Sequence, residues 1–228
     1  MLVQFLDGSS AELTWPPDLD LFSEGIAPSG WAFVPNRFAR DFFIRRGGPE
    51  EVVGLFGSPR LLTDYPDDEG GRVGFWRPEG WPDVDYLAFQ FDSWVVLVYD
   101  YRTGLYGGDP MNDEGRQLWA TNLHGQETDE GFLRLFADEP LQVAPAGGYP
   151  SPMNLTFFSP TGEIVLVPEN CDPGFVSPID GGEFTHWCDT SGLLSIRITG
   201  SPEYAQRVYD QLRVSNVHIA PGTASDDD

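Results

Sequence analysis

Carboxylates and tryptophans gather between residues 64 and 85, in a stretch with few signs of regular structure. Carboxylates can pair with Arg or Lys side chains of a partner, and tryptophans supply the buried anchors of many interfaces. The pattern therefore predicts a surface that binds another protein; the alternative is a solvated loop whose rings fold back onto the core. The residues expected to contact the partner are Asp64, Asp67, Asp68, Glu69, Trp76, Trp81, Asp83 and Asp85.

A bound divalent cation is a second interpretation of the same carboxylates. A calcium loop places oxygen ligands at alternate positions and a bidentate Glu at the twelfth position. Counted from Asp64, alternate positions hold Pro66 and Gly70 and the twelfth holds Phe75, so this spacing fails. Magnesium needs fewer protein ligands and stays an alternative, but we expect neither a metal nor another cofactor.

Few residues of this chain are suited to catalytic chemistry. The histidines are His124, His186 and His218. On a strand, His186 and Cys188 would share a face, which makes them the one plausible base and nucleophile. The chain has no G-x-S-x-G elbow, Walker loop or G-x-G-x-x-G turn. We therefore expect no catalytic residues, with a hydrolase built on carboxylates or on this His/Cys pair as the alternative.

The chain start predicts the compartment and, through it, the state of the cysteines. Residues 1–7 contain no basic n-region and no long apolar segment, and no apolar run of about 18 residues occurs anywhere. We expect a cytoplasmic protein that does not enter a membrane. In that compartment Cys171 and Cys188 should be reduced thiols. With His186 they offer three metal ligands, but no second C-x-x-C pair completes a zinc site.

Net charge narrows the class of partner. The 228 residues include 36 Asp and Glu against 13 basic residues, all of them Arg, which gives a net charge of −23. A field of one sign steers association with a cationic partner. Direct nucleic-acid binding is not expected, because phosphate contacts need clustered Lys and Arg. A merely solvated acidic surface and imitation of nucleic-acid charge are the alternatives.

The pattern of apolar residues predicts an α+β fold, mostly antiparallel sheets with three or four short helices. Aromatic and β-branched residues are dense in the two strongest strands, 86–91 and 94–101. Apolar positions at helical spacing, end residues and caps favour helices at 35–46, at 50–56, from Thr128 through Phe136, and from Ser201 onward. A further strand is expected at 117–121, and hairpin strands are expected at 155–158 and 163–167.

A Pro-, Gly- and Ala-rich stretch at 140–152 is the expected boundary between two parts. Residues 1–145 would form an α+β domain with a central sheet and helices. Residues 146–228 would form a smaller antiparallel β unit with a C-terminal helix. Whether the two parts share one core is left open by the sequence.

The middle of the chain resembles a known family. The residues that carry the likeness are the strand Tyr86-Leu-Ala-Phe89, the segment Tyr99-Asp-Tyr-Arg-Thr-Gly104 and the expected helix Phe132-Leu-Arg-Leu-Phe136. Residues 86–139 are in this respect similar to the SUKH superfamily of bacterial immunity proteins, in which a D-x-x-T-G turn precedes an F-x-x-F helix. The resemblance implies a toxin–antitoxin role, in which a non-enzymatic protein neutralises a cognate toxin.

Charge, the acidic aromatic stretch and the absent catalytic motifs together predict a non-enzymatic binding protein. We expect an immunity protein or inhibitor that neutralises a basic effector such as a nuclease toxin. Its partner would be a basic protein, either a toxin or a nucleic-acid-binding protein. A hydrolase and a nucleic-acid mimic that blocks a DNA-binding protein remain the alternatives.

Overall fold

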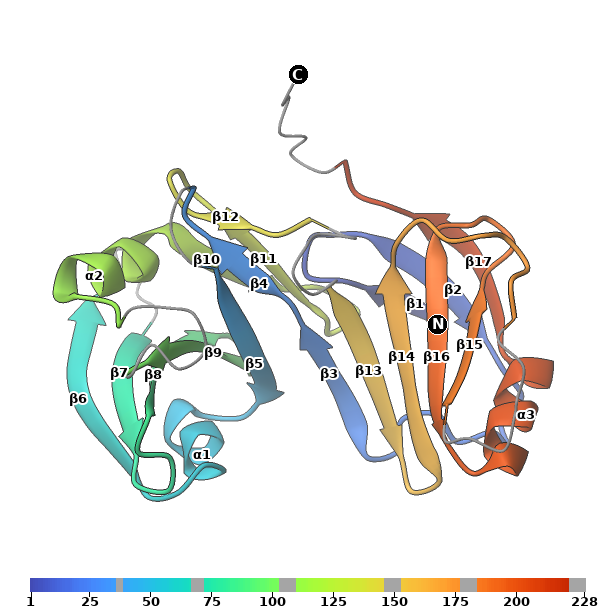
Figure 1. Ribbon diagram of the computed structural model, residues 1–228, viewed down its shortest axis with the longest axis horizontal. Helices are drawn as coiled ribbons and strands as arrows, with labels where there is room; N and C mark the ends of the chain where they lie inside the picture. The colour runs from blue at the N-terminus through green and yellow to red at the C-terminus, as the bar shows by residue number, and fades with distance from the viewer. Residues whose placement is uncertain (36–38, 67–71, 103–109, 146–152, 177–183, 222–228) are drawn as a thin grey trace. The chain divides into compact units, whose positions relative to one another are not determined.

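The computed structural model is a predominantly antiparallel β structure (Figure 1). The residues that it describes are 1–35, 39–66, 72–102, 110–145, 153–176 and 184–221. They group into two compact units, one made of Met1–Pro28 with Pro145–Asp228 and the other of Ser29–Ala144. The first 28 residues thus belong with the C-terminal part of the chain.

The expected α+β fold with three or four short helices is wrong, because the protein is mostly β. The described residues form seventeen strands and three helices, one of which has only six residues. Part of the expected helix at 35–46 is the strand β5 (Arg40–Arg46), and the core of the expected helix that ends at Phe136 is the strand β11 (Leu133–Ala137). In both strands burial alternates with a period of two, and this pattern overrides the helical spacing of their Phe and Leu residues.

The expected strand at 117–121 is also wrong, because these residues lie in the helix α2 (Asp113–Asn122). Asn112 caps this helix by accepting a hydrogen bond from the backbone N–H of Gly115 at 2.8 Å. Asp113 and Glu114 occupy the first turn, where negative charge is favourable. The cap and the acidic first turn are local features that fit a helix here.

A seven-stranded sheet organises the unit Ser29–Ala144. Its strand order is β12-β4-β5-β9-β8-β7-β6, and every neighbouring pair of strands is antiparallel. Besides β5, its strands are β4 (Trp31–Phe33), β6 (Pro59–Pro66), β7 (Arg72–Pro78), β8 (Val84–Phe91), β9 (Trp94–Tyr101) and β12 (Gln142–Val143). The predicted strands at 86–91 and 94–101 are confirmed as the central pair β8 and β9.

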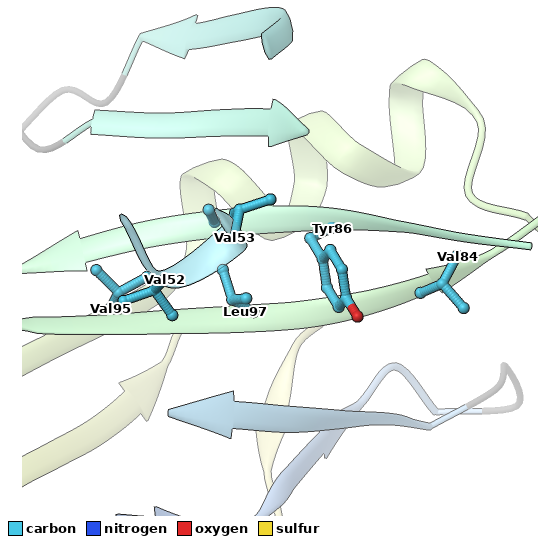
Figure 2. Close-up of a cluster of buried hydrophobic side chains, with 7 residues drawn as sticks. Val52, Val53, Val84, Tyr86, Val95 and Leu97 are labelled. Carbon is cyan, nitrogen blue, oxygen red and sulfur yellow. The ribbon is translucent and has the colours of Figure 1, made fainter. Parts of the chain in front are cut away.

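One face of this sheet packs against the short helix α1 (Pro49–Gly54). Figure 2 shows Val52 and Val53 of the helix against the side chains of the two central strands. The sheet residues in this cluster are Val84, Tyr86, Ala88, Val95 and Leu97. They alternate along β8 and β9, so the residues between them belong to the opposite face.

The opposite face carries a buried ionic network. Asp85 and Asp100 face each other directly across β8 and β9 and are only 2% and 1% exposed. Arg77 donates to both Asp85 oxygens, through Nε at 2.9 Å and an amino group at 2.8 Å, and Arg102 lies 3.4 Å from the same carboxylate. Arg116 of α2 donates twice to Asp100, at 3.1 and 3.0 Å. Like charges directly opposite each other destabilise a sheet, so these arginines are what makes the pairing tolerable.

The unit that holds both chain ends contains two further sheets. One has the order β1-β2-β17, from β1 (Leu2–Gln4), β2 (Ser10–Thr14) and β17 (Arg213–His218). The other has the order β15-β16-β14-β13-β3, from β3 (Gly25–Ser29), β13 (Asn154–Ser159), β14 (Gly162–Pro168), β15 (Phe184–Cys188) and β16 (Leu194–Gly200). The predicted hairpin is confirmed as β13 and β14, and the predicted helix from Ser201 as α3 (Pro202–Gln211).

Cys171 and Cys188 form a disulfide, with their Cα atoms 5.9 Å apart. The expectation of reduced thiols is therefore wrong. The disulfide links the segment before Val176 to β15. Val176 itself forms an isolated β-bridge with Trp187 of that strand. The spacing of the two cysteines in the sequence does not predict this disulfide, because only the folding of the chain brings them close together.

Within the described residues, no helix is both long enough and apolar enough to cross a bilayer.

Asp100→Asn should lower the free energy of unfolding by about 3 kcal/mol, because Arg116 would lose its buried counter-ion. Asp113→Asn is the matched control. Asp113 pairs with the same arginine at 3.1 Å but is 92% exposed, so its loss should cost less than about 0.5 kcal/mol. Urea-induced unfolding followed by tryptophan fluorescence measures both. Equal effects of the two substitutions would contradict the structural role of the buried network.

Candidate functional site

A cavity of about 260 Å³ opens beside the connection between β7 and β8, within the unit Ser29–Ala144. Its wall comes from this connection and from the end of β9. The lining residues are Gly80, Trp81, Pro82, Asp83, Val84, Tyr99 and Tyr101. Two of the residues predicted from sequence to contact a partner, Trp81 and Asp83, therefore lie together at one hollow in the surface.

Two glycines bring the β7–β8 connection close to the end of α1. Gly57 has a φ of +122°, and a Cβ there would lie 2.5 Å from the backbone nitrogen of Gly80. A Cβ on Gly80 would in turn collide with the carbonyl oxygen of Phe56. This close approach places the Phe56 ring against Trp81, with ring centroids 5.4 Å apart in an edge arrangement. Trp81 is thereby held from one side while 48% of it remains exposed.

Tyrosines form the other side of the cavity. Tyr99 and Tyr101 are two residues apart on β9, so they share a face, and their rings lie nearly parallel at 11° with centroids 5.8 Å apart. The ring of Tyr86 on β8 packs against that of Tyr99, with centroids 5.3 Å apart, and against that of Phe56, with centroids 5.0 Å apart. The cavity wall is therefore continuous with the apolar cluster shown in Figure 2.

The Tyr99 hydroxyl of this wall stays neutral at ordinary pH. Burial, followed by the neighbouring Tyr101 and Asp41, raises the pKa of Tyr99 to about 12. Burial also raises the pKa of Tyr86, whose hydroxyl has no hydrogen-bond partner among the described residues. The charge on the cavity lining is consequently that of Asp83, which is exposed.

The other residues predicted to contact a partner are distributed differently. Trp76 is half-buried and packs against the same apolar cluster, and Asp64 is exposed on β6. Asp85 is buried on the opposite face of the sheet in its ion pairs with arginine, so its carboxylate is committed within the chain. The remaining three, Asp67, Asp68 and Glu69, lie outside the described residues.

Sequence reasoning missed Tyr99 and Tyr101 as site residues. Both were treated only as strand formers, because they belong to a run with strong β propensity. Two features of the sequence could have indicated their role. Tyr99 and Tyr101 are two residues apart, so they share a face of the strand, and they end the strand that pairs with the one beginning just after Trp81 and Asp83. What could not be read from sequence is the close contact at Gly57 and Gly80 that brings Trp81 over this end of the sheet.

Among the described residues, the His186/Cys188 pair and the two facing carboxylates of the central strands hold structural roles. Cys188 is in the disulfide, and His186 lies instead 2.6 Å from the hydroxyl of Ser195. That hydroxyl belongs to a residue with 0% exposure, so no substrate can reach it as the chain is folded. The close carboxylates Asp85 and Asp100 are likewise buried and neutralised by arginine.

One group of potential metal ligands occurs among the described residues, made of Cys171, Cys188 and Asp189. The two sulfur atoms are bonded to each other. Both oxygens of Asp189 accept two hydrogen bonds each, from the backbone and hydroxyl of Ser191 and from the backbone of Leu193 and Leu194. Asp189 therefore organises a turn, and this group offers no free ligand as folded.

Comparison of the chain with family models, curated proteins and solved structures gives no match. The similarity to the SUKH superfamily accordingly stays a prediction. One segment that carried it, Phe132–Phe136, contributes to the strand β11 rather than to a helix. The geometry of the cavity and the charge of the chain are therefore the features that bear on function.

Tyr99→Phe should reduce the loss of stability between pH 10 and pH 12. The pKa of this residue is about 12 in the folded protein, against about 10 for an unperturbed tyrosine. Between these values the folded state keeps a proton that the unfolded state releases, so stability falls as pH rises. Chemical denaturation at a series of alkaline pH values measures the slope. An unchanged slope in the variant would mean that Tyr99 is not buried as described.

Proposed function

We propose that this protein is a non-enzymatic binding protein that docks on a basic protein and neutralises it, as immunity proteins and nuclease inhibitors do. The observation that carries the proposal is the fixed but half-exposed Trp81, set beside Asp83 at the edge of an aromatic cavity. An ordered tryptophan that remains open to solvent is the kind of anchor on which protein interfaces depend.

Exposed apolar side chains extend this surface around α1. Leu55 follows the helix directly, and Leu61 of β6 lies against Gly74 and Trp76 on the sheet face that α1 covers. Together with Trp81 they supply three large exposed apolar side chains around one short helix. Glu50, Glu51 and Asp64 are exposed acids in the same elements, so apolar contacts are bordered by negative charge. Such a composition suits a docking surface with an apolar centre and a charged rim.

The net charge of −23 determines the chemistry of the partner. A cation-rich protein is attracted over long range and its binding weakens as salt is added, whereas an acidic protein is repelled. A nuclease is a favourable case, because its substrate groove must itself be positive to hold phosphates. Covering that groove would neutralise the enzyme without any chemistry by the inhibitor.

The cytoplasm is the compartment that we propose for this interaction. The Cys171–Cys188 disulfide is the feature that opposes this assignment, because disulfides persist mainly in oxidising compartments. The docking surface lies in the other unit, so the proposal does not depend on the state of these cysteines.

Binding to a panel of purified basic nucleases at low salt tests the proposal, with inhibition of nuclease activity as the second readout. We expect salt-sensitive binding that is lost when the lysines of the nuclease are succinylated. Trp81→Ala should weaken binding by about tenfold or more, as removal of an interface anchor does. Phe136→Ala is the matched control, since Phe136 is an equally exposed aromatic of the same unit on β11.

Absence of binding to every nuclease at low salt would overturn the proposal. So would binding that Trp81→Ala and Phe136→Ala weaken equally, because the attraction would then come from net charge and not from this surface.

A further inference from the structure

We infer that the cavity beside Trp81 receives one arginine side chain of the partner, with its guanidinium against the tyrosine rings and Asp83 as its counter-ion. The inference rests on the proposed function and adds the chemical group that the surface recognises. Four observations support it: the size of the cavity, the charge of its lining, the shape of its aromatic wall and the way that wall is held.

The cavity is the right size for a single side chain. Its volume is about 260 Å³, below the range of about 300–1,000 Å³ that is typical of small-molecule sites. Neither a helix nor a strand of a partner fits inside it. One long side chain projecting from a docked surface does fit, and Arg is among the residues enriched at the centre of interfaces.

The lining selects a positive charge. Asp83 supplies a carboxylate, and the six other lining residues carry no charged side chain. Asp41 adds a second carboxylate nearby, since it precedes Phe42, which pairs with Val98, and thus lies beside Tyr99 on the neighbouring strand. The faces of aromatic rings are themselves electrostatically negative. An anionic group would therefore be repelled.

Arg102 forms its ion pair with Asp85, which belongs to the opposite face of the sheet, and not with Asp83. One of its amino groups also donates to the backbone carbonyl oxygen of Trp81 at 3.4 Å. Its backbone N–H donates to the carbonyl oxygen of Asp83 at 2.9 Å, which fixes the position of Asp83 without using its carboxylate. Among the described residues the Asp83 carboxylate forms no ion pair, so it can meet the partner's arginine.

The wall favours arginine over lysine. Tyr99 and Tyr101 present nearly parallel rings, and a planar, weakly hydrated guanidinium stacks on such a surface better than a compact ammonium does. The same fold already places guanidinium groups over rings. Arg116 lies 3.8 Å from the ring centre of Phe75, and Arg46 lies 4.5 Å from that of Trp94. The partner's arginine would repeat this contact between chains.

The wall is formed before the partner arrives. The close contact at Gly57 and Gly80 and the ring of Phe56 hold Trp81, while Tyr86 supports Tyr99 from below. Little side-chain freedom remains to be lost on binding, and this lowers the entropic cost of recognition.

Titration of the ¹⁵N-labelled full chain with Nα-acetyl-arginine amide tests the inference. The readout is the indole N–H resonance of Trp81, identified by its absence in Trp81→Phe. We expect a saturable shift with the arginine amide, a weaker response to Nα-acetyl-lysine amide, and none to Nα-acetyl-citrulline amide, which has nearly the same shape but no charge. A citrulline response equal to that of arginine would overturn the inference.

Asp83→Asn should weaken binding of the arginine amide by about fivefold, through loss of the counter-ion. Asp129→Asn is the matched control, because it removes an exposed acid of the same unit that lies outside the proposed surface and changes the net charge by the same amount. Equal weakening in the two variants would show that net charge and not the cavity attracts the probe, and would contradict the inference.

The outcomes for the inference and for the proposed function are separable. If the arginine amide moves the Trp81 resonance but no basic nuclease binds, the cavity assignment stands and the proposed function fails. If a nuclease binds through Trp81 while the arginine amide leaves the resonance unmoved, the proposed function stands and the inference fails.

Discussion

The pairing of Asp85 with Asp100 across the central strands is the interaction on which the rest of this unit depends. Two carboxylates that are nearly excluded from water stand opposite each other, and they are tolerable only because Arg77, Arg102 and Arg116 surround them. These arginines come from the neighbouring strand β7, from the residue after β9 and from the helix α2. The network therefore joins three separate segments of the chain to one point of the sheet.

This network also determines which residues face the cavity. Successive residues of a strand point to opposite sides, so burial of Asp85 and Asp100 on one side sends Tyr86, Tyr99 and Tyr101 to the other. A shift of the strand register by one residue would turn each side chain to the other face of the sheet. The tyrosines would then lie beside the arginines, and the carboxylates would lie in the apolar contacts with α1. Electrostatics on one face thus fixes the register that builds an aromatic wall on the other. The proposed recognition of a cation is a consequence of that wall.

Patterns of residue type along the chain predicted some of the individual strands but not how separate segments meet. The strand 94–101 is dense in aromatic and β-branched residues and was confirmed, whereas the segment 133–137 was wrongly expected to be helical because its Leu and Phe spacing fits both periods. The mixture of tryptophan and acids predicted a partner-binding stretch; the structure places two of its residues, Trp81 and Asp83, at one cavity, and the binding itself stays a prediction. The arrangement around Trp81 was not predictable, because the contact between Gly57 and Gly80 joins segments that are distant in sequence.

The most direct test of this account is a set of intermolecular nuclear Overhauser effects in a complex with a basic nuclease whose arginines are ¹³C-labelled. The account predicts cross-peaks from the δ protons of one arginine to the ring protons of Trp81 and of Tyr99 or Tyr101. A complex in which these rings receive no cross-peak from any arginine, while arginines contact other surfaces of the protein, would contradict it.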